Sequence, residues 1–445
     1  MPVVTRFAPA PTGRLHVGNI RTALLCALFA RRHGGRFLLR LDDTDAARSS
    51  EAHAEAIRAD LAWLGLAPDA EYRQSDRFAL YETAFERLRE AGRVYPGWES
   101  EEELALARKV RLGRGLPPIY DRAALALDAA DQARLGIERG PPHWRFRIDG
   151  EAGPIAWEDM VRGRASFDPA LLSDPVVRRG DGSWLYMLPS VVDDVDMGVT
   201  HVVRGEDHVA NSAIQLQMFG ALGAAPPEFA HTALLIGSEG KLSKRLGSLG
   251  VDALREAGIE PAAIAAKLAR IGTSLPVEAL ADLAPLAATL DFATFGRAPA
   301  RFDMAELEAL NARIVHGLPF AAVADRLPTG MDETAWDAIR SNITRVDEAG
   351  AWWEIVHGDA AIPAAAEEDR TLIQAAADAI DELDWNAAPW TALADLMKSR
   401  TGRTGKPLFQ PLRRALTGRD HGPEMAKLLP LIGKERAKAR LQAAL

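Results

Sequence analysis

Two short runs of this sequence combine residue types that bind phosphate. The first is residues 16–19, HVGN, which fall between an expected strand and an expected helix. Gly18 lets a ligand approach the backbone closely, and the start of the next helix offers unpaired N–H groups and the positive end of a dipole. His16 can donate to triphosphate oxygens as negative charge redistributes at the α-phosphorus. Alone, this run is a weak signal, because His-x-Gly-x recurs by chance.

The second run is residues 241–245, KLSKR, which follow a glycine-flanked turn at 237–240. Three cations on such a loop can brace a pyrophosphate leaving group, because a Lys ammonium acts as a mobile point charge. Alone, this run would be interpreted as a basic surface loop. The presence of both runs in one chain favours phosphate chemistry.

Strand and helix signals alternate at the start of the chain, as they do in parallel α/β domains. We expect strands over residues 3–8 and 36–41 and helices over 19–33 and 50–64. Two such units in succession predict a Rossmann-like sheet. The HVGN run then lies in the crevice where open parallel sheets bind ligands.

The rest of the chain divides by its pattern. Residues 74–184 change to polar helices, one of them at 122–135, and short strands, which indicates an insertion into the sheet. Strand signals then return, and from about residue 251 nearly everything is expected to be helical, including the Ala-rich stretch 361–379. The later strands are expected at 143–148, 176–179, 184–187 and 199–204, with a helix at 211–222.

Composition excludes several classes of protein. The chain has 445 residues, of which 48% are hydrophobic and 26% charged, so disorder of the whole chain is excluded. The longest apolar stretch near the start, residues 23–30, is far shorter than the roughly 18 residues of a spanning helix, so we expect no membrane segment. Cys26 is the only cysteine, which excludes internal disulfides and Cys-based zinc sites and favours a cytoplasmic location.

Charge is distributed unevenly along the chain. The formal net charge is −9, yet residues 398–445 contain twelve basic and three acidic residues. This asymmetry favours a polyanion-binding C-terminal end, although a solvated helical surface would have the same composition.

Together the two runs resemble those of class I aminoacyl-tRNA synthetases, in which residues 16–19 match the HIGH motif and 241–245 the KMSKS motif. The run RFAPAPTGRLHVGN at 6–19 is similar to that of glutamyl-tRNA synthetases. Further matches are LRLDDTD at 39–45, Tyr186 followed by VVDD at 191–194, and GVTHVVRGED at 198–207. The resemblance covers the first 310 or so residues and continues more loosely to the C-terminus.

The resemblance implies a pocket for glutamate and ATP. Arg6 and Arg204 would bind the carboxylates of glutamate, with the Tyr186 hydroxyl alongside, and Asp42 would bind its ammonium group. The alternative is that both arginines form structural ion pairs with Asp42, Asp193 or Asp194. Ala8 and Ser190 complete the expected glutamate site. The catalytic residues would be His16, Lys241 and Lys244. The ATP site would comprise His16, Gly18, Asn19, Asp207, Leu235, Lys241, Ser243, Lys244 and Arg245.

The resemblance also implies cofactors and departs from the family at named positions. ATP is expected with Mg²⁺ on its triphosphate. Family members usually have Ser where this chain has Ala10, Glu where it has Asp42, and often Asn where it has Ser190, so the glutamate pocket is expected to differ. Many relatives carry zinc cysteines in the insertion, whereas YPGWE at 95–99 has none, so we expect no zinc.

The fold class implied is α/β, a Rossmann-like catalytic domain with an inserted acceptor-binding domain, followed by an all-helical anticodon-binding region. The catalytic domain would be 1–73 and 185–250, and the acceptor-stem insertion 74–184. A helical stem-contact region would cover 251–310 and the anticodon domain 311–445. Within that domain, Arg403, Lys406, Arg413 and Arg414 would bind tRNA.

The expected activity is ATP-dependent activation of L-glutamate and its transfer to tRNA(Glu) by a cytoplasmic monomer. Whether tRNA(Gln) is also charged stays open. A glutaminyl-tRNA synthetase would begin with a PPEPN run where residues 8–12 here are APAPT, and would end in β-barrels. A glutamyl-queuosine tRNA synthetase would be shorter. A catalytically inactive tRNA-binding paralogue would need a decayed motif, whereas His16, Gly18, Lys241 and Lys244 are all present.

Overall fold

The computed structural model describes residues 2–237 and 250–445. The chain forms two compact units. The first runs to Leu254 and includes Ile264–Asp303, and the second combines Arg255–Ala263 with Met304–Leu445.

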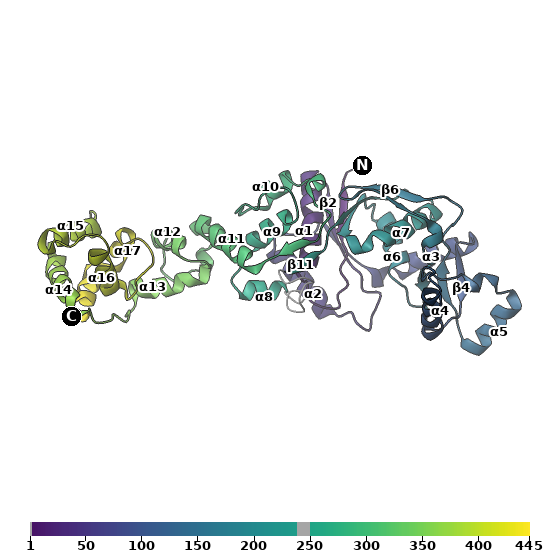
Figure 1. Ribbon diagram of the computed structural model, residues 1–445, viewed down its shortest axis with the longest axis horizontal. Coiled ribbons are helices and arrows are strands. Elements are labelled where there is room, and N and C mark those ends of the chain that lie inside the picture. The colour runs from purple at the N-terminus through teal and green to yellow at the C-terminus, as the bar shows by residue number, and fades with distance from the viewer. Residues whose placement is uncertain (1, 238–249) are drawn as a thin grey trace. The chain divides into compact units, whose positions relative to one another are not determined.

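The first unit is built on a seven-stranded sheet in the order β3-β2-β1-β9-β10-β6-β7. Figure 1 labels β2 and β6 of this sheet. All neighbouring pairs are parallel except β6 and β7, which are antiparallel. This confirms the α/β class with a Rossmann-like core. In sheet order the strands are Ala70–Arg73, Arg36–Leu41, Val4–Phe7, His201–Gly205, Glu228–Thr232, Ile155–Asp159 and Gly163–Phe167.

Helix α1 (Val17–Arg32) packs against β1, β2 and β9 on one side and α10 (Leu283–Ala288) on the other. Because it is covered on both sides, its residues from Ala23 to Ala30 are all buried, and the sequence is apolar without a polar stripe. The helix is therefore a fixed support for the residues at its start. The other helices of this unit that flank the sheet are α2 (Glu51–Trp63), α3 (Phe78–Glu90), α6 (Met187–Asp196) and α7 (Val209–Ala221).

The segment expected as an insertion divides between two sheets. β4 (Val94–Gly97), β5 (His143–Phe146) and β8 (Val176–Arg178) form a small antiparallel sheet that α4 (Glu101–Gly113) and α5 (Ala129–Arg139) accompany. In contrast, β6 and β7 lie inside the expected range 74–184 but extend the main sheet, because β6 pairs with β10. A second small sheet pairs β11 (Leu235–Gly237) with β12 (Ala300–Phe302), which adds a strand in a region that was expected to be nearly all helical.

Two expected elements differ from the structure. The strand expected at 184–187 is instead a single bridge at Trp184 followed by α6, whose Leu188, Val191 and Val192 are buried at helical spacing. The helix expected at 122–135 is a short 3₁₀ turn followed by α5, which begins later because the Asp128 side chain accepts from the Asp131 N–H and caps it.

The second unit is helical within its described residues. One core packs fully buried side chains, including Leu393, Leu412, Leu428 and Leu441, of α14 (Arg370–Ala379), α15 (Pro389–Thr401), α16 (Lys406–Thr417), α17 (Met425–Ile432) and α18 (Lys434–Ala443). In the Ala-rich stretch 361–379, the α-helix begins only at Arg370. Pro363 and then the acidic 3₁₀ turn Glu367–Asp369 precede α14. Among the helices of residues 2–237 and 250–445, none is both long and apolar enough to cross a membrane. The remaining α-helices from residue 250 onward are α8 (Val251–Glu256), α9 (Pro261–Arg270), α11 (Met304–Gly317), α12 (Glu333–Ile339) and α13 (Ala349–His357).

Candidate active site

His16 caps the start of α1. Its Nδ1 accepts from the Gly18 N–H at 3.1 Å, and its own N–H donates to Asn19 Oδ1 at 3.3 Å. Burial lowers the pKa of His16, which favours the neutral ring. Since Nδ1 is an acceptor, the neutral ring carries its proton on Nε2 and can donate from there. A Cβ at Gly18 would lie 3.0 Å from His16 Cε1, so glycine at this position also keeps the ring in place.

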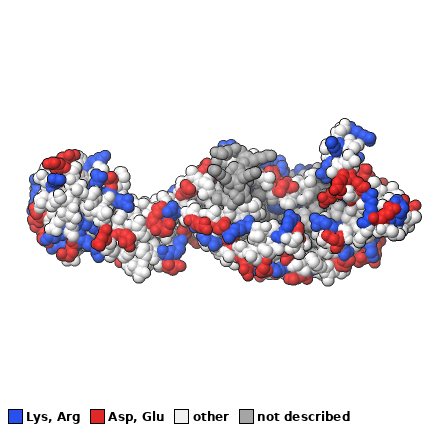
Figure 2. Space-filling view, turned by 90° about the horizontal axis from the view of Figure 1, so that it is seen from below, with Lys and Arg blue, Asp and Glu red and all other residues white. Residues whose placement is uncertain are grey.

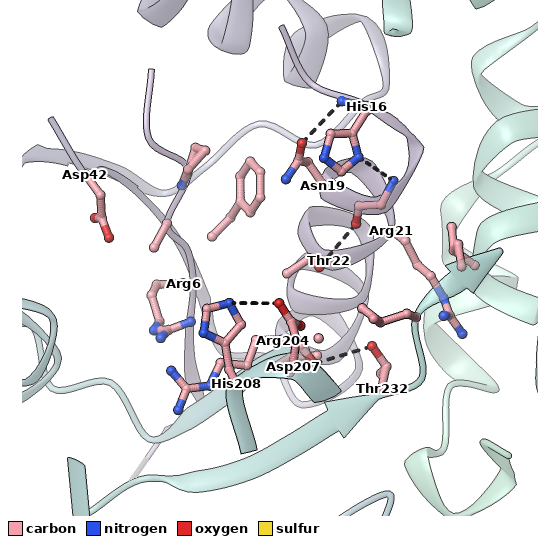
Figure 3. Close-up of a pocket in the computed structure, with 18 of the residues that line it drawn as sticks. Arg6, His16, Asn19, Arg21, Thr22, Asp42, Arg204, Asp207, His208 and Thr232 are labelled. Carbon is pink, nitrogen blue, oxygen red and sulfur yellow. Dashed lines mark hydrogen bonds and ion pairs between the residues drawn. The ribbon is translucent and has the colours of Figure 1, made fainter. Parts of the chain in front are cut away.

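A cavity of about 330 Å³ lies at the carboxyl ends of β1, β9 and β10, beside the start of α1 (Figure 3). Asp42, Arg6 and His208 gather at one side of it, and His16 and Asn19 lie at the start of α1. This is where open parallel sheets bind ligands. The residues expected from the sequence that line it are Arg6, Ala8, His16, Gly18, Asn19, Asp42, Tyr186, Arg204, Asp207 and Leu235.

Arg204 is a buried cation whose hydrogen-bond partners are all uncharged. Its Nη1 donates to the Tyr186 hydroxyl at 2.8 Å, and its Nη2 donates to Ser212 Oγ at 2.6 Å and Gln215 Oε1 at 2.8 Å. Among the described residues no carboxylate forms a salt bridge with it within 4.0 Å. Burial lowers the pKa of Arg204. A ligand carboxylate would supply the counter-charge that the protein does not place there.

Arg6 is arranged differently. Its Nε lies 3.0 Å from Asp194 Oδ1, and both side chains are buried. For Arg6 the alternative of a structural ion pair is therefore present in the structure, while the guanidinium also lines the cavity. Beneath it, Arg40 is fully buried and contacts Asp194 at 2.9 Å and Asp193 at 3.6 Å. The floor of this side of the cavity is thus a network of buried opposite charges.

Asp42 joins this network from the cavity wall. Its Oδ1 and Oδ2 accept from Arg40 Nε and Nη2 at 2.6 and 3.0 Å, a bidentate pair that fixes the carboxylate. Burial raises the pKa of Asp42, although the charge of Arg40 opposes that rise. Ser190 does not line the cavity: its side chain is fully buried and its Oγ accepts from Arg40 Nη2 at 3.1 Å. Ser190 therefore contacts Arg40, which lines the cavity, and does not itself reach the cavity surface.

Sequence reasoning missed several lining residues: Arg21, Thr22, Arg40, His208 and Thr232. Arg40 carried a signal, because a charged residue inside the apolar strand RFLLRL needs a partner, and Asp42 follows two residues later. His208 carried one too, since it follows a run already singled out at 198–207. The contributions of Thr22 and Thr232 depend on packing between segments far apart in sequence.

Lys241, Ser243, Lys244 and Arg245 lie outside the described residues. The described neighbours on either side are Gly237, which ends β11, and Gly250, which forms a bridge with His16.

The four expected tRNA-binding residues lie at and near α16. Arg403 is tied to Asp369 at 2.5 Å and Arg413 donates to the Pro423 carbonyl at 2.9 Å, so both already hold structure together. Arg414 and Lys406 are exposed, with Arg414 3.7 Å from Asp420. Figure 2 shows Lys and Arg intermixed with Asp and Glu over the visible face of the second unit, at the left of the view.

Metal-binding side chains are sparse at the cavity. In the described parts of the chain, no three His, Cys, Asp or Glu residues gather as a metal site. Asp42 is occupied by Arg40, which leaves Asp207 as the more exposed carboxylate that lines the cavity. This donor set suits Mg²⁺, which commonly binds through one or two carboxylates together with water and substrate phosphates.

Comparison with known proteins agrees with this geometry. Residues 2–307 match the family model described as tRNA synthetases class I (E and Q), catalytic domain, and residues 357–445 match the one described as anticodon binding domain. A glutamate–tRNA ligase 1 of Rhizorhabdus wittichii is 67% identical over 442 residues, covering 99% of both chains. A glutamate–tRNA ligase 2 of Erythrobacter litoralis is 61% identical over 447 residues, covering 99% of this chain and 98% of that one.

A solved structure is similar over the same extent. The crystal structure of a glutamate tRNA ligase from Elizabethkingia meningosepticum in complex with its amino acid matches with a TM-score of 0.86 at 28% identity, covering 100% of this chain and 99% of that chain. The catalytic-domain model alone covers more than half of the sequence. The chain therefore belongs to the class I aminoacyl-tRNA synthetases of the glutamate and glutamine branch and, within them, to the glutamate–tRNA ligases.

Proposed function

We propose that the cavity binds L-glutamate and ATP side by side and that its residues carry out both half-reactions of a glutamate–tRNA ligase. A glutamate carboxylate oxygen attacks the α-phosphorus of ATP, giving glutamyl-adenylate and releasing pyrophosphate. The terminal ribose hydroxyl of tRNA(Glu) then attacks the activated carbonyl and AMP leaves. The observation that carries the assignment is Arg204, a buried cation with neutral partners at the wall of the cavity.

Glutamate would lie at the side of the cavity where Arg204, Arg6 and Asp42 meet (Figure 3). Arg204, with the Tyr186 hydroxyl fixed at 2.8 Å beside it, supplies one cation for a carboxylate and Arg6 the other. Asp42, fixed by Arg40, receives the ammonium group. Because Arg6 is already paired with Asp194, it contributes less uncompensated charge than Arg204.

ATP would lie against the start of α1. Gly18 and Asn19 supply the backbone end of the helix, and His16 donates from Nε2 to the phosphates. Lys241 and Lys244, with Ser243 and Arg245, stabilise the charge that develops on the pyrophosphate. Leu235 and Asp207 border the nucleoside. Mg²⁺ bound to the triphosphate would neutralise phosphate charge, and Asp207, which lines the cavity, is a carboxylate that could help to hold it.

The parts outside the cavity have proposed roles as well. The insertion at 74–184 would bind the acceptor stem, 251–310 would contact the stem, and 311–445 would bind the anticodon arm, with the strands β6 and β7 assigned to the catalytic sheet. We expect a cytoplasmic monomer, which light scattering would check. Aminoacylation of purified tRNA(Glu) and tRNA(Gln) side by side would determine whether the second tRNA is a substrate.

Amino-acid selectivity tests the assignment of Arg204. Glutamine would leave the buried guanidinium without a counter-charge, a mismatch that gives discrimination on the order of 10⁴-fold in kcat/KM. Pyrophosphate exchange in the presence of tRNA should therefore favour glutamate by this factor, and Arg204→Gln should lose most of it. Comparable activation of glutamine by the unaltered enzyme would refute the cationic pocket.

A further inference from the structure

A buried chain of three side chains runs behind Arg204, across neighbouring strands. Asp159 at the end of β6 contacts His231 of β10, with Oδ2 2.5 Å from Nδ1. The other ring nitrogen, Nε2, lies 2.8 Å from Ser212 Oγ of α7 and 3.3 Å from Arg204 Nε. His231 and Arg204 are register partners in β10 and β9, so both side chains lie on one face of the sheet.

The protonation of this chain follows from its contacts. Asp159 accepts hydrogen bonds from the backbone N–H groups of Val161, Arg162 and His231 at 3.1, 2.9 and 3.2 Å. Together with the hydrogen bond from the His231 ring, they keep the pKa of Asp159 low despite its burial. Burial lowers the pKa of His231, which favours the neutral ring. The ionised Asp159 accepts a hydrogen bond from Nδ1–H, so the neutral ring carries its proton on Nδ1 and Nε2 is an acceptor.

The arrangement of Asp, His and Ser matches the order of a nucleophilic triad, but the surroundings exclude that use. Ser212 and His231 are completely buried, and Ser212 Oγ already accepts from Arg204 Nη2 at 2.6 Å. No substrate carbonyl can reach this hydroxyl. Ser212 and His231 contact Arg204 directly, and Asp159 contacts it through His231.

The acceptors on Arg204 explain what such a chain can do. Four hydrogen bonds, to His231, Tyr186, Ser212 and Gln215, engage the guanidinium, which has five N–H groups. These partners fix its plane without neutralising it, because all four are uncharged acceptors. Within the Asp159–His231–Ser212 row, only Asp159 carries a charge, and the His231 ring separates it from Arg204.

We infer that Asp159 and His231 are positioning residues that set glutamate specificity, because they hold Arg204 in a fixed orientation while leaving its charge for the substrate. The inference rests on the proposed role of Arg204 as the carboxylate-binding cation. An imidazole between the carboxylate and the guanidinium accepts a hydrogen bond from Arg204 and withholds the counter-charge that a direct ion pair would supply. If His231 no longer held Arg204 in this orientation, the affinity for glutamate would fall, whereas the affinity for ATP would not change.

Asp159→Asn is the sharpest test, because it keeps the size of the side chain and replaces one acceptor oxygen with an N–H donor. The new amide donates to Nδ1, so the proton of His231 moves to Nε2, where it faces the Arg204 Nε–H. We expect the KM for glutamate to rise by ~10- to 100-fold, the size of a lost hydrogen bond to a charged group, while the KM for ATP changes less than about twofold. The measurement is pyrophosphate exchange with tRNA present.

A second pair of variants separates positioning from packing. His231→Gln offers one N–H to Asp159 and one oxygen to Arg204, whereas His231→Phe fills the space and offers neither. His231→Gln should keep most of the glutamate affinity that His231→Phe loses. Equal loss in both, or a fall of kcat and of ATP affinity together with glutamate affinity, would assign His231 to packing alone and overturn the inference.

Asp174→Asn is the matched control. Asp174 is another buried carboxylate of the first unit, which accepts from the Tyr95 hydroxyl at 2.8 Å and from Arg122 at 2.9 Å. It should lower thermal stability without changing the glutamate KM. Arg204→Lys distinguishes the two levels of the proposal. If it leaves the glutamate KM unchanged, the proposed function of Arg204 fails; if it raises the KM while Asp159→Asn does not, only the positioning role fails.

Discussion

At the side of the cavity with Asp42, buried ion pairs lie beneath the surface. Arg40 is fully buried and contacts Asp42, Asp193 and Asp194, so each partner depends on the others for compensation. Removing one member of such a pair leaves a buried charge uncompensated and typically costs about 3–5 kcal/mol. Substitutions at Arg40 should therefore unfold the site before they report on its chemistry, and Asp42 is the more informative position.

The pH dependence of glutamate activation should reveal Asp42. Its pKa is raised above the ordinary aspartate value by burial, and only the ionised carboxylate can bind an ammonium group. We expect kcat/KM for glutamate to be constant above this pKa and to fall as pH drops through it. Asp42→Asn should lower kcat/KM at neutral pH and lack this acid limb. An unchanged acid limb in the variant would show that another group titrates.

Phosphate stabilisation should be lost when His16 or Lys244 is removed. Both groups are proposed to act on charge that develops in the transition state, so His16→Ala and Lys244→Ala should each lower kcat for adenylate formation by roughly 10²-fold or more. Affinity for tRNA should stay close to that of the unaltered enzyme, which filter binding would measure. Full pyrophosphate exchange by either variant would contradict its assignment.

The individual site residues were predictable to different degrees. Arg6, Asp42 and Arg204 follow the motifs, and the structure brings them to one cavity. Ser190 was expected beside the ligand, yet it binds Arg40 from behind, which no local pattern reveals. The neutral surroundings of Arg204 come from Tyr186, Ser212 and His231 on separate elements, so they depend on the tertiary arrangement.

Among the elements, the first βα units were predictable and the later ones less so. β1, α1, β2 and α2 form where the alternating signals and the glycine pair after α1 placed them. The strand expected at 184–187 covers the apolar and aromatic residues that lead into α6, and tertiary burial decides the structure of such short runs. β6 and β7 were not assigned to the main sheet because pairing across about seventy residues leaves no local trace.

The corner between β4 and β5 should hold together without zinc. Tyr120 donates to Glu99 Oε1 at 2.5 Å, and His143 Nε2 lies 3.5 Å from Glu99 Oε2. A Cβ at Gly97 would lie 2.7 Å from that nitrogen, so side chains already fill the corner. A structural zinc site needs four ligands, more than the Glu99 and His143 side chains provide. Elemental analysis of the purified enzyme should find no stoichiometric zinc, and a zinc-selective chelator should leave activity intact once Mg²⁺ is restored.

For the whole molecule, the basic C-terminal region offers a test of tRNA binding. Arg403 and Arg413 are partly committed to Asp369 and Pro423, whereas Lys406 and Arg414 are exposed. Each lost phosphate contact should lower the slope of log K against log salt by a little under one unit. Lys406→Ala with Arg414→Ala should therefore flatten this slope for tRNA(Glu) and unrelated tRNAs alike, because backbone contacts do not read sequence.

Lys427→Ala provides the control for that measurement. Lys427 is as exposed as Arg414, at 57%, and lies on α17. Its removal changes the net charge by the same amount as either single substitution but should leave the slope unchanged. If the double variant also leaves it unchanged, these residues belong to a solvated surface.

The only cysteine of the chain, Cys26, can be used to measure the local stability of the first unit. Cys26 lies fully buried in α1, its Sγ 3.3 Å from the Arg6 carbonyl oxygen, and burial raises the pKa of its thiol to about 12. A thiol with so little thiolate and no access to solvent reacts with alkylating reagents only when α1 separates from the sheet. The rate of labelling in the native protein therefore reports the opening free energy of the helix that supports His16. It also follows that a fluorophore placed on an introduced surface cysteine would label that position without background from the native thiol.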